Sequence, residues 1–539
     1  MMLFKFLNKK FLLINVVSVL IIFTTSILLR IPNVRPTQYL GKEHDWITAH
    51  VLLTNSIWQK NGILKYKLNP VFTFDYEQDR KISIFNHVID EKGDKFYISY
   101  PPFSFYVPFA IFKLTGSFPN VAGIRSISLA VQFFTGFLLF LLVYHIGGKN
   151  IKNEFYFPAI VAFLLYTFNA ANLWVNGNLY FADVLVQLFF VGFVYTVIQY
   201  LSKSKTQKTK NPKKYFYYSV ILGFLMVYTE WIGVFVLFVS FVVSLFFIKN
   251  RAFLKLAFWS SASGVFALLV TLFQYGQISG WNNLISALNA KFEERSGISD
   301  NVLLNFTISN PVARDALKNY YIEGYNPLLW GGAIIFVLAI IFSLIKPTFN
   351  TDKKNEILIA ILLATIPVLL HILLLFNFNS WHRFSIHKTS FPLILSIATL
   401  LILIFNRIEN YKKVNIFFIC IFSVGFGLIA YKSYSDYTKK INPSFNFTKY
   451  KIAAEAIQKY SKPTDIIYTN AFSCPELMFY AQRNTFTVNN IEECIAQITT
   501  AEKINEGLYV GCFEQVLDCI YRIEKSGNKK LLWQREINY

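Results

Sequence analysis

Three adjacent side chains that can exchange protons or carry charge, Glu43, His44 and Asp45, stand near the start of a long polar segment. The residues from Trp46 to Ile57 then place apolar side chains at helical spacing. Asp45 can cap the N-terminus of this helix, which is an ordinary structural role. It can also serve as a general base that takes the proton of a hydroxyl group, provided that it is held rigidly and shielded from water. The two roles are compatible, because a cap fixes the geometry of a base.

A second group of candidate residues lies towards the end of the same segment. Tyr100 precedes Pro101 and Pro102 in the stretch SYPPFSFY, and Lys95 comes five residues earlier. Prolines suit the first turn of a helix, where a missing N–H group costs nothing. If the segment folds back on itself, Tyr100 and Lys95 lie beside Asp45.

Two further acids stand at the ends of apolar runs. Asp183 begins one run after the stretch NLWVNGNLYF, and Glu230 stands in the turn YTEWIG between two short runs. Each is a candidate for substrate binding, because ionisable groups at membrane depth are costly and often functional. The alternatives are a helix cap for Asp183 and a solvated turn for Glu230.

The stretch NFNSWHRFSIHK concentrates four basic side chains: His382, Arg383, His387 and Lys388. Arginine and lysine close to the headgroup plane are suited to bind a lipid-linked phosphate. Ordinary attraction to anionic lipid headgroups is the alternative interpretation. His371, inside an apolar run, is expected to pack between helices rather than to form part of a site.

The composition indicates the elements that must position these residues. Of the 539 residues, 54% are hydrophobic and 18% aromatic, and the mean hydropathy is +0.41, values typical of membrane proteins that cross the bilayer many times. A spanning helix needs about 20 mostly apolar residues. Eleven candidates follow: 11–29, 126–146, 155–175, 180–201, 215–229, 231–248, 256–275, 326–345, 357–377, 389–406 and 414–431.

The distribution of basic residues predicts the orientation of these spans. The short loops at 147–154, 202–214, 249–255, 346–356 and 407–413 are all basic, as expected for loops retained in the cytoplasm. The segment 30–125 and the residues after 431 are then extracytoplasmic. We interpret the apolar stretch 102–115 as an interfacial helix, because counting it as a span would place every later basic loop outside. The net charge of +21 is largely a topology signal, so we expect no nucleic-acid partner.

A boundary near residue 432 separates a domain of spans, 1–431, from a small extracytoplasmic α/β domain, 432–539. Helices are predicted at 449–460, 473–481, 491–503 and 513–525, and strands near 466, 485, 508 and 531. Four of the five cysteines lie here and could form up to two disulfides. Their spacing does not favour a metal site.

In these motifs the chain resembles the GT-C glycosyltransferases, in particular bacterial relatives of protein O-mannosyltransferases (glycosyltransferase family 39) and lipid A aminoarabinose transferases. The resemblance covers roughly the first 430 residues. It rests on the acidic motif after the first span, on SYPPFSFYVPFAIFKLTG followed by GIRSISLA with Arg125, on NLYFADVLVQLFF with Asp183, and on RFSIHKTSFPLILSIA. It implies a helical transmembrane bundle with a large first extracytoplasmic loop.

The resemblance also implies roles for individual residues. Asp45 corresponds to the catalytic base, with Glu43 as the other possibility and His44 between them. Tyr100 takes the place where relatives often have lysine or histidine, so the phosphate contact would come from Lys95, Arg125 or the stretch from His382 to Lys388.

The implied reaction transfers a sugar from polyprenyl phosphate to a hydroxyl group, with inversion, on the non-cytoplasmic face of the plasma membrane. The acceptor is a lipid, a glycan or a protein. We expect no cofactor; a divalent metal is possible but not favoured. The alternatives are a transporter or flippase for lipid-linked sugars, an oligosaccharide polymerase or ligase, and a receptor or scaffold.

Overall fold

The computed structural model describes residues 9–30, 45–75, 87–147, 157–204, 212–298, 307–325, 351–405, 449–462, 465–470, 475–500, 506–513 and 516–534, with a few isolated residues between 332 and 436. The chain divides into two compact units. Unit 1 comprises Met1–Arg35, Ser126–Val270 and Phe292–Ile441, and unit 2 comprises Pro36–Arg125, Thr271–Lys291 and Asn442–Tyr539. The division into domains at residue 431 stays a prediction.

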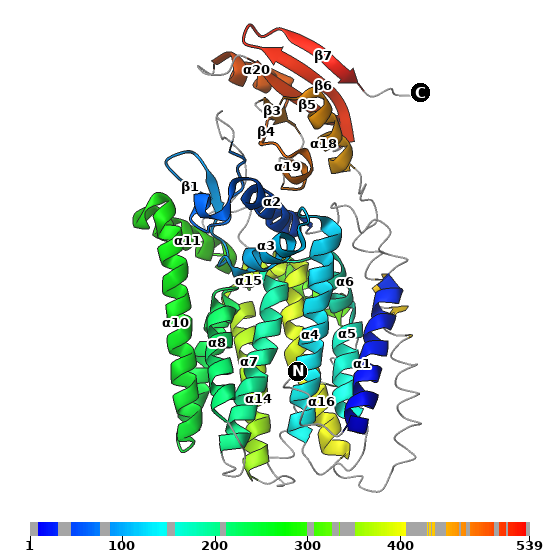
Figure 1. Cartoon of the computed structure of the whole chain (residues 1–539), viewed down its shortest axis with the longest axis vertical. Helices are drawn as coiled ribbons and strands as arrows, with labels where there is room; N and C mark the ends of the chain where they lie inside the picture. Colours follow the sequence, from blue (N-terminus) through cyan, green and yellow to red (C-terminus); the bar gives the residue numbers. More distant parts are fainter. Residues whose placement is uncertain are drawn as a thin grey trace. The chain divides into compact units, whose positions relative to one another are not determined.

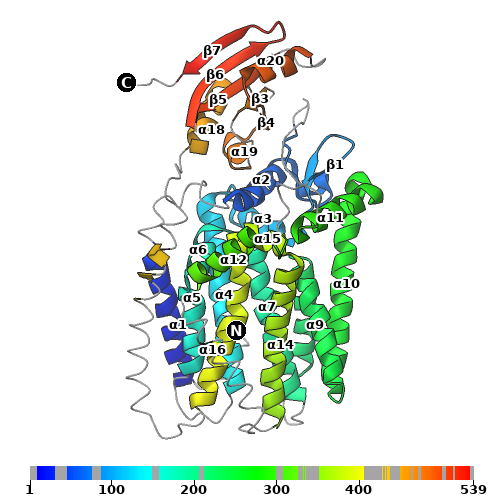
Figure 2. The ribbon, with the colours of Figure 1, turned by 180° about the vertical axis from the view of Figure 1, so that it is seen from behind.

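Unit 1 is a bundle of apolar helices that run side by side (Figures 1 and 2). Its long helices are α1 (Lys9–Arg30), α4 (Val121–Gly147), α7 (Ala182–Ser204), α10 (Arg251–Ser279), α14 (Thr351–Leu374) and α16 (Ser390–Phe405). Five described helices are long and apolar enough to cross a membrane, or six if one bent pair is counted as a span. The multi-span helical fold is confirmed, but the number of eleven spans is not. The predicted spans 326–345 and 414–431 fall almost wholly outside the described residues.

The predicted span 155–175 is not one straight helix. It consists of α5 (Phe157–Phe168) and α6 (Ala170–Asn178), which meet at an angle of 58°. Asn169 lies between them in an extended conformation, and its side chain accepts a hydrogen bond from the backbone N–H of Asn172. Because this side chain caps α6, the polypeptide starts a new helix there instead of continuing the old one.

The two short predicted spans form a tight helical pair, α8 (Lys213–Val227) and α9 (Ile232–Phe246), with Glu230 in the turn between them. Gly233 makes the turn possible. A Cβ atom at this position would lie 2.6 Å from the backbone of Met226 and of Val227. In the same unit α7 packs against α8 and α14, and α12 (Pro311–Gly324) packs against α15 (Phe376–Trp381). The 3-10 helix η4 (Arg383–Thr389) leads directly into α16.

Unit 2 contains the first polar segment and the C-terminal residues. The first segment forms α2 (Asp45–Asn61), η3 (Ile63–Tyr66), the hairpin β1 (His87–Ile89) and β2 (Lys95–Tyr97), and α3 (Phe103–Thr115). Helix α3 is apolar but has only 13 residues, with Pro108 inside it, and is too short to count as a span. Helix α11 (Trp281–Ser296) follows α10.

The C-terminal residues form a five-stranded sheet in the order β4-β3-β5-β6-β7. Its strands are β3 (Ile466–Thr469), β4 (Thr485–Thr487), β5 (Glu506–Phe513), β6 (Val516–Glu524) and β7 (Lys529–Gln534). Strand β3 pairs in parallel with β4 and β5, and the later pairs are antiparallel. Helices α18 (Lys449–Tyr460) and α19 (Pro475–Ala481) pack into one hydrophobic core and α20 (Ile491–Thr500) into another.

One prediction for this domain is wrong, and the upper limit of two disulfides is not reached. Residues 513–525 were predicted as a helix, but 516–524 form strand β6. The buried side chains of this strand, Leu517, Ile520 and Ile523, recur every three residues as in a helix. A register shift between Ile520 and Tyr521 breaks the usual alternation of a strand. Cys494 and Cys519 are free thiols, so the four cysteines do not form two disulfides.

Candidate functional site

Asp45 is the first residue of α2, and its side chain is fully buried. It faces Arg125 on α4, whose Nη2 atom lies 3.3 Å from Oδ2 and 3.5 Å from Oδ1. Both side chains are 4% exposed or less. A carboxylate and a guanidinium that share a buried contact hold each other in fixed orientations, because leaving either charge buried alone would cost several kcal/mol. Asp45 is therefore a rigid, desolvated carboxylate, as a general base requires.

The surroundings of α2 are aromatic. His50, one turn further along the helix, packs against the rings of Trp46, Phe72 and Tyr97 at centroid distances of 5.4, 4.4 and 5.2 Å. Burial lowers the pKa of His50 to about 3, so this imidazole is neutral near pH 7. Tyr100 stacks on Tyr97 at 6.5 Å. The predicted return of the segment onto itself is thus present, since α3 packs against α2.

Helix α2 is also held by α3 and by residues from the C-terminal part of the chain. Asn55 donates a hydrogen bond to the carbonyl oxygen of Phe105 on α3, and α19 packs against α2. Asn484 bonds the backbone of Phe74 twice, accepting from its N–H at 2.9 Å and donating to its oxygen at 3.1 Å.

Among the other candidates from the first polar segment, Lys95 lies in β2 and is 8% exposed. Glu43 and His44 lie outside the described residues.

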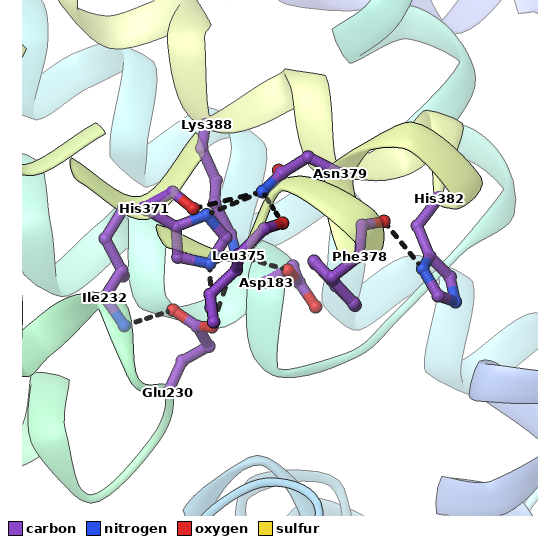
Figure 3. Close-up of polar contacts among 9 residues, drawn as sticks. All are labelled: Asp183, Glu230, Ile232, His371, Leu375, Phe378, Asn379, His382 and Lys388. Carbon is purple, nitrogen blue, oxygen red and sulfur yellow. Dashed lines mark hydrogen bonds and ion pairs between the residues drawn. The ribbon is translucent and has the colours of Figure 1, made fainter. Parts of the chain in front are cut away.

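A second polar cluster lies in unit 1 and centres on Lys388 (Figure 3). The ammonium nitrogen lies 2.6 Å from Asp183 Oδ1, 3.2 Å from Glu230 Oε1 and 3.0 Å from His371 Nε2. All four side chains are 2% exposed or less. An ammonium group has three N–H donors. The Lys388 ammonium thus lies close to three acceptor atoms, which come from α7, the α8–α9 turn and α14.

Glu230 is the most constrained member of this cluster. Its Oε2 accepts a hydrogen bond of 2.7 Å from the backbone N–H of Ile232, the first residue of α9. Burial by itself would raise the pKa of the Glu230 carboxyl. The Lys388 ammonium, aided by the backbone N–H of Ile232, outweighs that effect and holds the pKa well below its ordinary value. Glu230 is thus a buried carboxylate rather than part of a solvated turn.

The other basic candidates do not join this cluster. His382 stacks on Phe378 at 4.4 Å, and its Nδ1 lies 2.8 Å from the carbonyl oxygen of the same residue. Arg383 pairs with Glu323 at 3.3 Å and covers the ring of Tyr320. His387 is fully buried, and neither of its ring nitrogens has a hydrogen-bond partner among the residues that the structure describes.

The structure thus brings several sequence candidates together in two places. Asp45 meets Arg125 in unit 2, and Asp183 and Glu230 meet Lys388 in unit 1. Sequence reasoning missed His371, which we expected only to pack between helices. In the described part of the chain, no three acidic, histidine or cysteine side chains are arranged to hold a metal ion.

The arrangement is that of a membrane protein with the GT-C fold, and solved structures share it. The oligosaccharyltransferase of Archaeoglobus fulgidus in complex with zinc and sulfate aligns with a TM-score of 0.56 at 12% identity, over 92% of this chain and 68% of that one. ArnT from Cupriavidus metallidurans bound to undecaprenyl phosphate aligns with a TM-score of 0.54 at 12% identity, over 93% of each chain.

A further structure from Archaeoglobus fulgidus, the oligosaccharyltransferase AglB in complex with an inhibitory peptide and a dolichol-phosphate, aligns with a TM-score of 0.54 at 11% identity, over 97% of this chain and 75% of that one. No family model and no curated protein matches the sequence. The predicted GT-C fold is confirmed. At such low identity the likeness shows the fold alone.

Proposed function

We propose that this protein is an inverting glycosyltransferase that moves a sugar from a polyprenyl phosphate to a hydroxyl acceptor on the non-cytoplasmic face of the membrane. The observation that carries the proposal is the buried Asp45–Arg125 ion pair in a chain with the GT-C fold. The neighbouring structures support the donor class, since ArnT was solved with undecaprenyl phosphate and AglB with dolichol-phosphate.

The chemistry needs one carboxylate and positive charge. The acceptor oxygen attacks the anomeric carbon and forms the new bond, while the bond from that carbon to the phosphate oxygen breaks. Asp45 takes the proton of the acceptor hydroxyl. The polyprenyl phosphate leaves as a stable anion, which needs a cation such as Arg125 rather than a general acid. A single displacement inverts the anomeric configuration. Glycoside hydrolysis, by contrast, requires two carboxyl groups.

The test is the variant Asp45→Asn in the full-length protein. The amide keeps the shape of the side chain but cannot accept the proton, so we expect transfer to fall at least about a hundredfold while donor binding persists. The matched control is Asp465→Asn, because Asp465 is also a buried aspartate paired with an arginine, Arg522 at 3.1 Å. Loss of that ion pair should leave transfer unchanged. Normal turnover by Asp45→Asn would refute the assignment of the base.

A transporter for lipid-linked sugars is the second candidate, and two observations favour it. Transporters use broken helices and ionisable residues inside the bundle. Here α5 and α6 form a broken span, and Lys388 holds two buried carboxylates. Proteoliposomes that carry a polyprenyl-linked sugar in one leaflet distinguish the two functions. Movement of the sugar to the other leaflet without transfer to an acceptor would favour the transporter.

A further inference from the structure

One face of α7 carries two buried polar side chains a turn apart. Asp183 and Gln187 are four residues apart, so they lie on the same face of the helix. Their exposed fractions are 1% and 0%. Helix α7 also contacts η4, which carries Lys388. A charged group and a neutral polar group therefore share one buried face inside unit 1.

Only one oxygen of the Asp183 carboxylate is paired. Oδ1 lies 2.6 Å from the Lys388 ammonium. Oδ2 is buried and has no hydrogen-bond partner among the described residues. Figure 3 shows the carboxylate beside Lys388, with its other oxygen directed away from that contact. The ion pair fixes the carboxylate and leaves one acceptor oxygen ready for a hydrogen-bond donor.

Gln187 makes no hydrogen bond in the described part of the chain, since both its Oε1 and its Nε2 are buried without a partner. Both ring nitrogens of His387 on η4 are likewise buried without a hydrogen-bond partner among the described residues. Buried polar side chains are nearly always hydrogen-bonded, because an unpaired one lowers stability. Gln199, further along α7, follows the rule and bonds the side chain of Tyr195. Gln187 and His387 therefore offer unpaired polar atoms to a water molecule or a ligand.

We propose that Asp183 and Gln187 form a subsite for the hydroxyl groups of a sugar ring, with His387 as a further hydrogen-bonding partner. A carboxylate oxygen accepts from a hydroxyl, and a carboxamide both donates and accepts, so the pair matches two neighbouring hydroxyls. A phosphate does not fit, because the free oxygen of Asp183 would repel it. The proposal rests on the proposed glycosyltransferase, in which the ring belongs to the donor lipid or to a glycan acceptor.

Direct binding to the full-length protein in detergent tests the subsite with three probes: undecaprenyl phosphate, undecaprenyl phosphate glucose and methyl glucoside. In the variant Gln187→Leu we expect about tenfold weaker binding of undecaprenyl phosphate glucose and unchanged binding of the sugar-free lipid. If the ring is that of a glycan acceptor, the loss appears with methyl glucoside instead. The control Gln199→Leu should bind all three probes like the wild type.

The outcomes separate the subsite from the proposed function. Equal binding of both sugar-bearing probes by Gln187→Leu and the wild type would overturn the subsite and leave water as its occupant. An equal loss for every probe would also overturn it, because the substitution would then act through packing. Failure of the wild-type protein to bind undecaprenyl phosphate in any form would count against the polyprenyl phosphate donor itself.

Discussion

At the residue scale, the polar interior of unit 1 depends on Lys388. Its ammonium is surrounded by the side chains of Asp183, Glu230 and His371, and all four side chains of this cluster are buried. Two carboxylates thus share one ammonium. A buried charge that loses its partner costs about 3–5 kcal/mol. The lysine therefore stabilises the fold. Its contact with a lipid phosphate stays a prediction.

The variant Lys388→Met keeps the length of the side chain and removes its charge. We expect the free energy of unfolding in detergent to fall by about 3–5 kcal/mol, since both carboxylates lose their partner. The control is Lys451→Met, which breaks an exposed pair with Glu455 at 3.6 Å and should cost less than about 1 kcal/mol. Similar losses in the two variants would show that the cluster does not stabilise the bundle.

The partners of these residues could not be read from the sequence. Glu230 was a candidate because it stands in a turn between two apolar runs, and Lys388 because it belongs to a basic stretch, but they are 158 residues apart in the chain. Only the packing of α7, α9 and α14 brings them together. The same packing converts His371 from an isolated histidine in a span into an acceptor for Lys388. Ionisable residue types were visible, whereas their pairing depends on tertiary contacts.

At the element scale, hydropathy located the helices but not their irregularities. The window 155–175 is apolar on average, so its hydropathy could not reveal the break at Asn169, where one side chain caps a new helix. In β6 a register shift gave buried residues a three-residue spacing that is typical of a helix. Both errors arise where a local hydrogen-bond pattern overrides the average periodicity of the sequence.

The α8–α9 turn leads to a prediction about close packing. In Gly233→Ala the added methyl group meets the backbone of Met226 and Val227, which cannot move aside as a side chain can. We expect a loss of about 1–3 kcal/mol in the free energy of unfolding. In Gly192→Ala on α7 the nearest atoms are leucine methyl groups at 3.4 Å, so that variant should be neutral or slightly stabilised. Equal tolerance at both glycines would contradict the packing described for the turn.

At the scale of the whole molecule, unit 2 is assembled from three separate stretches of the chain. Asn484 links two of them, because its side chain bonds both backbone groups of Phe74. The sequence predicted an independent α/β domain and gave no sign of this link, since a single asparagine in a loop carries no signal of its partner.

The variant Asn484→Leu tests this link. It leaves the Phe74 N–H and carbonyl without their partner, so hydrogen exchange at residues 70–75 should become faster and the free energy of unfolding should fall by about 1–3 kcal/mol. Asn489→Leu serves as the control, since Asn489 is exposed and its side chain bonds Glu493, four residues further on. Unchanged exchange at residues 70–75 in Asn484→Leu would show that the contact is dispensable.

The packing of α19 against α2 also determines when α2 can be fully packed during synthesis of the chain. A ribosome delivers the Asp45 helix early and residues 475–481 more than 400 positions later, a delay on the order of tens of seconds at typical elongation rates. Throughout that interval α2 lacks its contact with α19. The contact between α2 and α19 therefore forms only after α19 has been translated, and we expect a polypeptide truncated before residue 475 to leave that side of α2 uncovered.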